Sequence, residues 1–136
     1  MTRSFLPIIA LIVFGAPWNE ASAQTQGEMN QDAASEFKAV DEELNTIYQK
    51  ILEDYADDDV FLANLKEAQR CWITFRDAQL KMKYPDREPG YYGSIQPVCE
   101  MSYLTELTQD RIKTLNVWIE GVEEGNLCGG TVKVKE

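Results

Sequence analysis

The stretch FKAVDEELNTIYQKILEDY, residues 37–55, decides the fold class of this chain. Its apolar residues recur at steps of three and four, which places them on one face of an α-helix, and most of its charged residues fall off that face. We therefore predict a helix over about residues 28–55, entered through a capping box at residues 25–28. The apolar stripe consists of Phe37, Val40, Leu44, Ile47, Ile51 and Tyr55.

Two further segments show the same periodicity. The second helix is predicted over about residues 59–83, and Asp57-Asp58-Asp59 at its start suits a helix N-terminus, since the ligand spacing of a calcium loop is absent. The third is predicted to begin after a Ser94 cap, with Pro97 in its first turn, and to end near Gly121. The two stripes consist of Phe61, Leu65, Ala68, Trp72, Phe75, Gln79 and Met82, and of Val98, Met101, Leu104, Leu107, Ile112, Leu115, Trp118 and Val122.

These three helices predict an all-α fold, a small antiparallel three-helix domain. A short turn joins the first two helices, and short connections favour antiparallel neighbours. A long loop, residues 84–96, joins the second and third helices and contains two prolines, two glycines and three tyrosines. The bulky stripes predict a filled core, which argues against a small-ligand cavity between the helices.

The first 23 residues have the layout of a secretory signal peptide. Arg3 precedes an uncharged apolar run, and the small residues Ala21 and Ala23 fit a cleavage site after Ala23. The apolar run is shorter than the roughly 20 residues that a membrane-spanning helix needs. We expect residues 1–23 to be removed, residues 24–128 to form the domain, without a membrane span, and residues 129–136 to be a mobile tail. Export leaves two destinations open, the periplasm and the medium.

The composition argues against several classes of function. The 136 residues carry 23 acidic and 13 basic side chains, a net charge of −10, which opposes nucleic-acid binding and favours a basic protein partner. Histidine is absent, so Ser-His-Asp and Cys-His catalysis and histidine metal sites are excluded. Glycoside hydrolysis needs two carboxylates on either side of a sugar-binding cleft, and a short three-helix domain has little room for such a cleft. We therefore predict a protein-binding domain that is no enzyme and holds no metal or cofactor.

Three cysteines remain, and an odd number leaves at least one thiol unpaired within the chain. Cys71 lies well along the second helix and Cys99 near the start of the third, so about nine helical residues separate their levels, too many for a bridge between them. Cys128, on the tail, could reach either one. An intermolecular disulfide and the oligomeric state stay open.

Five elements of the chain, in order, resemble the LprI-like lysozyme inhibitor domain. They are residues 25–30, the Asp-x-x-Leu-Asn-x-x-Tyr element at 41–48, the Gln-x-x-Trp-x-x-aromatic-Arg-Asp core within 68–78, residues 93–95, and residues 104–111. The resemblance implies an exported, helical, non-enzymatic domain and an inhibitory role toward lysozyme.

Two sets of residues are candidates for a site. The resemblance makes Arg76 and Asp77 characteristic, and we expect them to form a structural polar network with Asp41 and Asn45, because a buried charge needs partners. The alternative is that Arg76 binds a carboxylate of a ligand or partner. In the loop, the candidate partner-binding residues are Tyr84, Asp86, Glu88, Tyr91 and Tyr92, since loop residues and tyrosines are common at interfaces. Their alternative is that the tyrosines fold back onto the helix ends.

The expected function is therefore protein binding after export, with inhibition of lysozyme. In this hypothesis the acidic surface steers the domain toward a basic enzyme, and the tyrosine-rich loop supplies aromatic anchors. The alternative is a structural or adaptor protein of the cell envelope without inhibitory activity.

Overall fold

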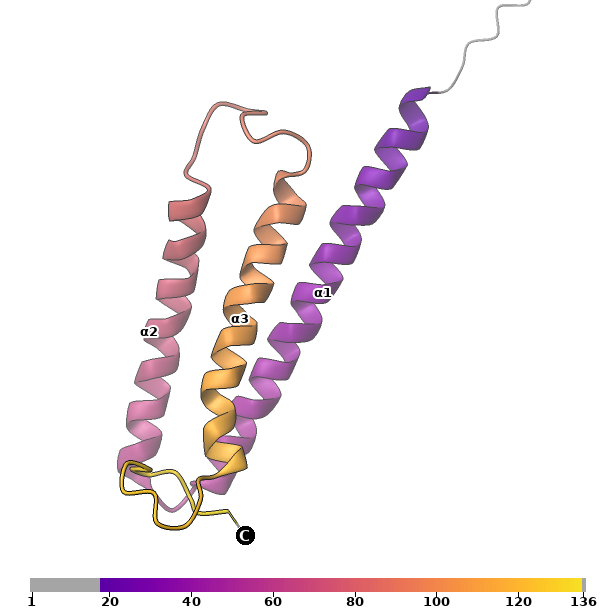
Figure 1. The fold of residues 1–136 in the computed structure, drawn as a ribbon. Helices are drawn as coiled ribbons and strands as arrows, with labels where there is room; N and C mark the ends of the chain where they lie inside the picture. The colour runs from indigo at the N-terminus through magenta and orange to yellow at the C-terminus, as the bar shows by residue number, and fades with distance from the viewer. Residues whose placement is uncertain (1–17, 136) are drawn as a thin grey trace, which may run out of the picture.

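The computed structural model describes residues 18–135, with the backbone alone over residues 18–24. It contains helix α1 (Trp18–Asp54), helix α2 (Asp59–Lys83) and helix α3 (Gln96–Glu120). Consecutive helices run antiparallel, so α1 and α3 point the same way (Figure 1). Between residues 18 and 135 the β-structure is limited to one isolated bridge, Val122 to Val134. The all-α prediction is confirmed.

Helix α1 begins ten residues earlier than the sequence predicted, at Trp18 rather than near Glu28. Residues 25–28 lie inside the helix, so the predicted capping box is wrong. The cause is the composition of the preceding stretch, where Ala, Glu and Gln favour helix. Of the predicted signal peptide, residues 1–17 lie outside the described residues, and the expected cleavage site after Ala23 falls within α1.

The predicted starts of the other two helices are correct in part. The Asp58 carboxylate accepts a hydrogen bond from the backbone N–H of Phe61 at 2.9 Å, which confirms aspartate capping of α2. Pro97 occupies the first turn of α3, as predicted. The Ser94 cap is wrong, because the N-cap position is Ile95 and no side chain caps this helix.

The core lies between α3 and the C-terminal part of α1, which pack closely, whereas the N-terminal part of α1 diverges from the bundle and α2 packs less closely on α3 (Figure 1). Small buried side chains suit this close approach. Thr108 is 0% exposed, and its hydroxyl donates to the Leu104 carbonyl at 2.7 Å. Thr105 is also buried and bonds in the same way to Met101. The main apolar cluster consists of Val40, Leu44, Ile51, Tyr55, Leu65, Ile112 and Leu115.

The stripe predicted for α2 is correct at Leu65 and wrong toward the C-terminal end of the helix. Phe75 is 57% exposed and Met82 70% exposed, whereas Gln69 is buried. The reason is helical geometry: residues repeating every seven positions drift by about 20° per repeat around a straight helix. The series containing Phe75 and Met82 therefore rotates away from the neighbouring helices, and Gln69 takes an inward position.

Residues 121–135 fold across the end of the bundle where α1 and α3 finish. The Val122 N–H donates to the Lys133 carbonyl at 2.9 Å, and the Lys133 N–H donates to the Tyr55 hydroxyl at 3.1 Å. The Trp118 indole N–H donates to the Thr131 hydroxyl at 3.3 Å. The segment that the sequence predicts to be mobile from residue 129 onward thus makes contacts as far as Lys135.

Candidate functional site

The loop between α2 and α3, residues 84–95, gathers its three tyrosines. The Tyr92 hydroxyl donates to the Pro85 carbonyl at 2.9 Å. The Tyr92 ring meets Tyr84 and Tyr91 edge-on, with centroids 5.6 Å and 4.9 Å away. Tyr84 and Tyr92 are half-buried, whereas Tyr91 is 67% exposed. The alternative of tyrosines that fold back onto the helix ends therefore fits Tyr84 and Tyr92, whereas Tyr91 stays exposed.

Two exposed carboxylates accompany Tyr91. Asp86 and Glu88 line the same shallow depression as Tyr91, and Arg87 lies between them in sequence. The Arg87 guanidinium is 5.9 Å from the Tyr91 ring centroid. Three of the five predicted partner-binding residues thus form one exposed group at the tip of the loop.

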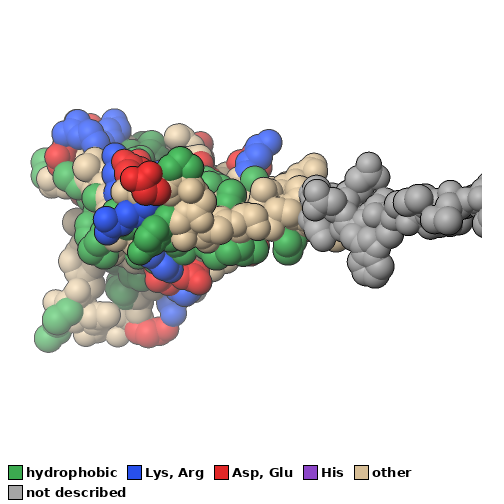
Figure 2. All heavy atoms as spheres, turned by 90° about the horizontal axis from the view of Figure 1, so that it is seen from above, with side chains coloured by type: hydrophobic (Ala, Val, Ile, Leu, Met, Phe, Trp, Pro, Cys, Tyr) green, Lys and Arg blue, Asp and Glu red, His purple; other side chains and the backbone are tan. Residues whose placement is uncertain are grey.

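Charge is distributed unevenly between the two ends of the bundle. Viewed from the loop end, acidic and basic side chains interleave (Figure 2). Lys81 and Lys83 close α2 there, and Lys83 lies 3.7 Å from the centroid of the Tyr103 ring. At the opposite end acidic side chains outnumber basic ones, although Lys50 pairs with Asp54 and Lys135 with Glu123 there. The tyrosine loop and the most acidic surface, predicted to act together, therefore lie at opposite ends. The acidic end carries Asp54, Asp57, Asp58, Asp59, Glu120, Glu123 and Glu124.

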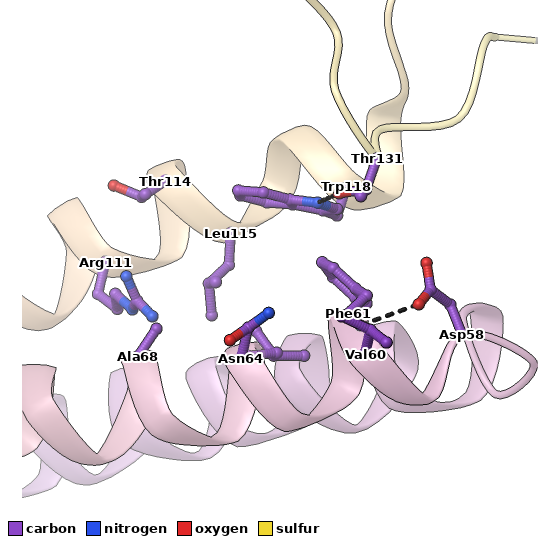
Figure 3. Close-up of a pocket in the computed structure, with 11 residues that line it drawn as sticks. Asp58, Val60, Phe61, Asn64, Ala68, Arg111, Thr114, Leu115, Trp118 and Thr131 are labelled. Atoms are coloured by element: carbon purple, nitrogen blue, oxygen red, sulfur yellow. Dashed lines mark hydrogen bonds between the residues drawn. The ribbon is translucent and has the colours of Figure 1, made fainter.

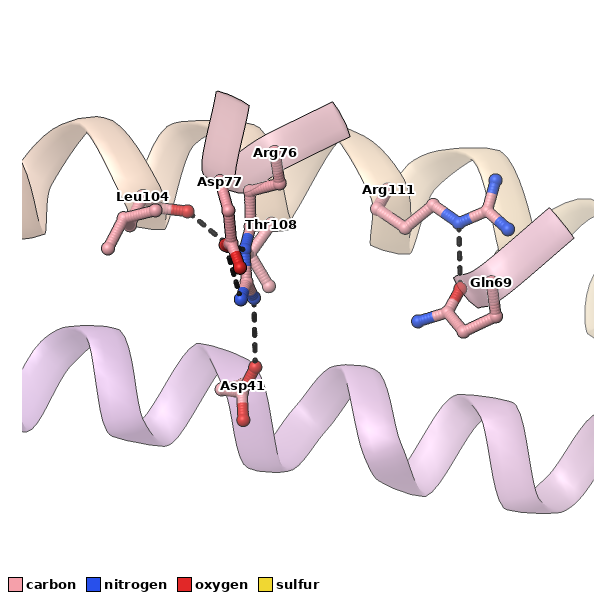
Figure 4. A network of polar contacts seen from close by, with 7 residues as sticks. All are labelled: Asp41, Gln69, Arg76, Asp77, Leu104, Thr108 and Arg111. Atoms are coloured by element: carbon pink, nitrogen blue, oxygen red, sulfur yellow. Dashed lines mark hydrogen bonds and ion pairs between the residues drawn. The ribbon is translucent and has the colours of Figure 1, made fainter. Parts of the chain in front are cut away.

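Arg76 lies at the centre of a polar network between α1 and α2 (Figure 4). Its guanidinium is 3.5 Å from the Asp41 carboxylate and 3.0 Å from that of Asp77. The same group stacks over Trp72 at 5.3 Å and over Phe37 at 5.8 Å. The side chain of Arg76 is 15% exposed, which leaves little of it for a ligand and supports the structural interpretation.

Asn45, the fourth predicted member, lies outside this network. Its side chain is exposed and faces a surface depression shared with Thr46 and Gln49. Asn45 follows Asp41 by one helical turn of α1. Arg76 faces the turn that carries Asp41, so Asn45 lies outside the network.

A second polar pair was not predicted from the sequence. The Arg111 guanidinium on α3 donates from Nε to the Gln69 side-chain oxygen on α2 at 3.0 Å (Figure 4). Arg111 also stacks over Trp72 at 5.8 Å, and burial lowers its pKa. Trp72 is thus contacted by two guanidinium groups. The signal that could have revealed the pair is a glutamine four residues after Leu65, in register with the buried face of α2.

An apolar hollow of about 380 Å³ opens between α2 and α3 (Figure 3). The Phe61 and Trp118 rings lie at one end of it, with centroids 6.2 Å apart, and Arg111 lies at the other. The prediction of a filled core is therefore wrong on this side. The cause is the wider spacing of α2, which leaves room that short side chains such as Ala68 do not fill. The α2 side of the hollow is lined by Val60, Phe61, Asn64, Leu65 and Ala68.

All three cysteines are free thiols in the structure, and Cys71 and Cys128 are exposed. The Cys71 thiol donates a hydrogen bond to Glu67 at 3.4 Å, and this bond raises the pKa of Cys71. Across residues 18–135, His, Cys, Asp and Glu form no group of three suited to a metal ion. No described helix combines the length and apolar character that crossing a bilayer requires.

The sequence profile described as "Lysozyme inhibitor LprI" matches residues 18–115. The chain belongs to the LprI family. The matched LprI region contains the Arg76 network, the tyrosine loop and most of the hollow, and it ends before the tail that begins at residue 121.

Two relatives agree with membership of the LprI family. An uncharacterised protein of Rhizobium meliloti is 30% identical over 112 residues, covering 74% of this chain and 78% of that protein. The crystal structure of a DUF1311 family protein from Pseudomonas putida aligns with a TM-score of 0.55 at 18% identity, over 65% of this chain and 87% of the other. This second likeness supports the fold. An LprI family member is expected to act on a protein, and the family description names an inhibitor rather than a catalyst.

Proposed function

We propose that this LprI family member is an exported, non-enzymatic protein that binds and inhibits lysozyme through the tip of the loop 84–95. The observation that carries the proposal is the exposed Tyr91 ring, flanked by the exposed carboxylates of Asp86 and Glu88. The loop connects α2 and α3 at one end of the bundle, away from the core, so its exposed side chains can reach a partner's binding cleft (Figure 1).

The loop holds Tyr91 in place before binding. Tyr92 contacts the Tyr91 ring edge-on and is itself fixed by its hydrogen bond to Pro85. An aromatic anchor with two side-chain torsions loses little entropy on binding, and a preorganised loop loses less still. Tyr91 would fill an apolar subsite of the cleft, and Asp86 and Glu88 would pair with basic residues at its rim. Inhibition would follow from blocking substrate access.

The net charge has a separate role in this proposal. Lysozymes of the common animal type are basic, and a chain of charge −10 attracts a basic partner at low ionic strength. Because the acidic end is remote from the loop, its charge would increase the association rate without making contacts. Salt should therefore weaken inhibition mainly by slowing association.

The test is a turbidity assay of lysozyme on bacterial cell walls with purified protein. We expect Tyr91→Ala to weaken inhibition by about 30-fold, the effect of losing one hot-spot side chain. The double variant Asp86→Asn/Glu88→Gln should also lose inhibition. Its matched control is Glu43→Gln/Glu53→Gln, which removes the same charge from exposed positions on α1.

Two results would count against the proposal. Wild-type protein that fails to inhibit at a several-fold molar excess would overturn it and leave the adaptor alternative, for which capture of an endogenous envelope protein would be the evidence. Equal losses in the loop double variant and the α1 control would show that total charge, rather than the loop, determines binding.

A further inference from the structure

Helix α2 carries a second stripe, apolar apart from Asn64, which faces solvent. Its positions alternate in steps of four and three, the spacing of a coiled-coil seam, and every one of them is exposed. On the other side of the helix the buried residues are Leu65 and Gln69. We call the exposed stripe the α2 seam; it consists of Asn64, Ala68, Cys71, Phe75, Ala78 and Met82.

We propose that the α2 seam is the interface of a homodimer, in which α2 packs antiparallel against α2 of a second copy with the two-fold axis beside Cys71. This inference concerns a surface on the side of the bundle. It is independent of the loop tip and does not rest on the proposed inhibition of lysozyme.

Side-chain size fits an antiparallel pairing about this axis. Residue 71 is the midpoint of residues 60 and 82, and it lies within half a residue of the midpoint of 68 and 75. Met82 of one copy would thus lie opposite Val60 of the other, and Phe75 opposite Ala68. Large side chains then meet small ones, as interdigitating helices require. The isologous symmetry repeats each contact twice.

The hollow gives the second copy a place to dock. The α2 lining of the hollow includes Val60, Asn64 and Ala68. In the antiparallel pairing these three positions face Met82, Ala78 and Phe75 of the second copy. The same side chains that the monomer exposes would therefore fill the space that the monomer leaves open beside Phe61 and Trp118 (Figure 3). Burying Phe75 and Met82 in this way removes two large apolar side chains from water.

Charge favours the antiparallel orientation over the parallel one. Asp57, Asp58 and Asp59 lie at the N-terminal end of α2, and Lys81 and Lys83 lie in its last turn. Antiparallel packing sets the acidic end of each copy beside the basic end of the other. Parallel packing would set like charges together at both ends, which costs free energy.

The first test is the mass of the purified protein in reducing buffer, by light scattering and sedimentation. We expect a concentration-dependent dimer. Phe75→Glu should weaken dimerisation by at least about 30-fold, as loss of a buried hot spot does. The matched control is Ile73→Glu, an exposed apolar residue on the opposite side of the same helix. Circular dichroism should show that both variants keep the helical content of the wild type.

The second test locates the two-fold axis of the dimer by crosslinking through Cys71. Antiparallel helices 8–10 Å apart bring facing Cα atoms to within about 5 Å, close enough for a disulfide. Cys99→Ser/Cys128→Ser protein retains Cys71 alone. With oxidised glutathione, two Cys71 thiols should form one intermolecular disulfide and release two molecules of reduced glutathione. A Cys71→Ser/Cys99→Ser variant, which retains Cys128, should crosslink far less.

Three outcomes would overturn the inference. The first is a protein that stays monomeric up to about 1 mM, where even a weak association is visible. The second is a dimer that Phe75→Glu and Ile73→Glu affect equally. The third is a Phe75-dependent dimer that does not crosslink through Cys71, which would exclude the proposed axis.

Discussion

The guanidinium of Arg76 on α2 lies 3.5 Å from the carboxylate of Asp41 on α1, and this ion pair links two helices that otherwise approach each other little. Phe37 and Trp72 stack on the same guanidinium from the two helices. Arg76 is largely buried, whereas Asp41 is 41% exposed. The residue that the family resemblance makes most characteristic thus stabilises the α1–α2 contact.

We expect Arg76→Met to lower the free energy of unfolding by about 2 kcal/mol, because it leaves the Asp41 and Asp77 carboxylates without their cation and removes the stacking contact. Urea unfolding followed by tryptophan fluorescence would measure the change. Lys38→Met is the control, since the exposed Lys38–Glu42 pair at 3.7 Å should contribute less than about 0.5 kcal/mol. Equal effects of the two substitutions would contradict a central role for Arg76.

The stripes of α1 and α3 could be predicted from the sequence because both helices bury their apolar faces in the same interface. Leu44, Ile51 and Tyr55 are buried as predicted, and so are Ile112 and Leu115. Local apolar spacing determines which face of a helix is buried when the partner helix runs alongside it. It says nothing about buried threonines, and Thr105 and Thr108 were therefore not predicted.

The open side of α2 could not be predicted, because two stripes compete on that helix. Its sequence fits one stripe through Leu65 and Trp72 and another through Ala68 and Phe75, and the packing of whole helices decides which one is buried.

The exposure of individual residues in the tyrosine loop could not be predicted from the sequence either. The composition of the loop indicated an interface, but only the fold distinguishes the exposed Tyr91 from the half-buried Tyr92.

Substitutions at Thr108 test how closely α1 and α3 are packed. Thr108 is fully buried, and its hydroxyl bonds within its own helix. We expect Thr108→Val, which keeps the shape, to lower the free energy of unfolding by about 1 kcal/mol. Thr108→Leu should cost about 2–3 kcal/mol, because extra methylenes must be accommodated between closely packed helices. Urea unfolding of both variants would measure this, and a leucine variant as stable as the valine variant would show that the interface is loose.

A substitution at Gly121 tests whether the tail, residues 121–135, is held against the end of the bundle. The φ of Gly121 is 75°, and a Cβ atom there would lie 2.8 Å from the Lys133 carbonyl oxygen. Gly121→Ala should therefore release the tail and cost about 2–3 kcal/mol, from backbone strain and the lost contacts. Gly125→Ala is the control, because Gly125 has a φ of 86° but open space around it, and about 1 kcal/mol is expected. Faster proteolysis after residue 121 in the first variant, but not the second, would support this. Equal cleavage in both would show that the tail is not held at Lys133.

The effect of Glu67 on the pKa of Cys71 can be tested, because the structure predicts the direction of the change. The hydrogen bond from Cys71 to Glu67 is the main reason for the raised pKa of this thiol, and the negative charge of Glu67 acts in the same direction. Arg70, paired with the same carboxylate, opposes this and has the smaller effect. Glu67→Ala removes the acceptor and the negative charge, so the pKa of Cys71 should fall and more thiolate should be present at any given pH. The rate of alkylation by iodoacetamide should then rise, and its pH profile should move to lower pH.

The measurement uses Cys99→Ser/Cys128→Ser protein that also carries Phe75→Glu, so that the proposed dimer does not cover the thiol. Glu43→Ala on α1 is the control, and a profile that moved equally in both variants, or moved to higher pH in Glu67→Ala, would show that Glu67 does not set the reactivity of Cys71.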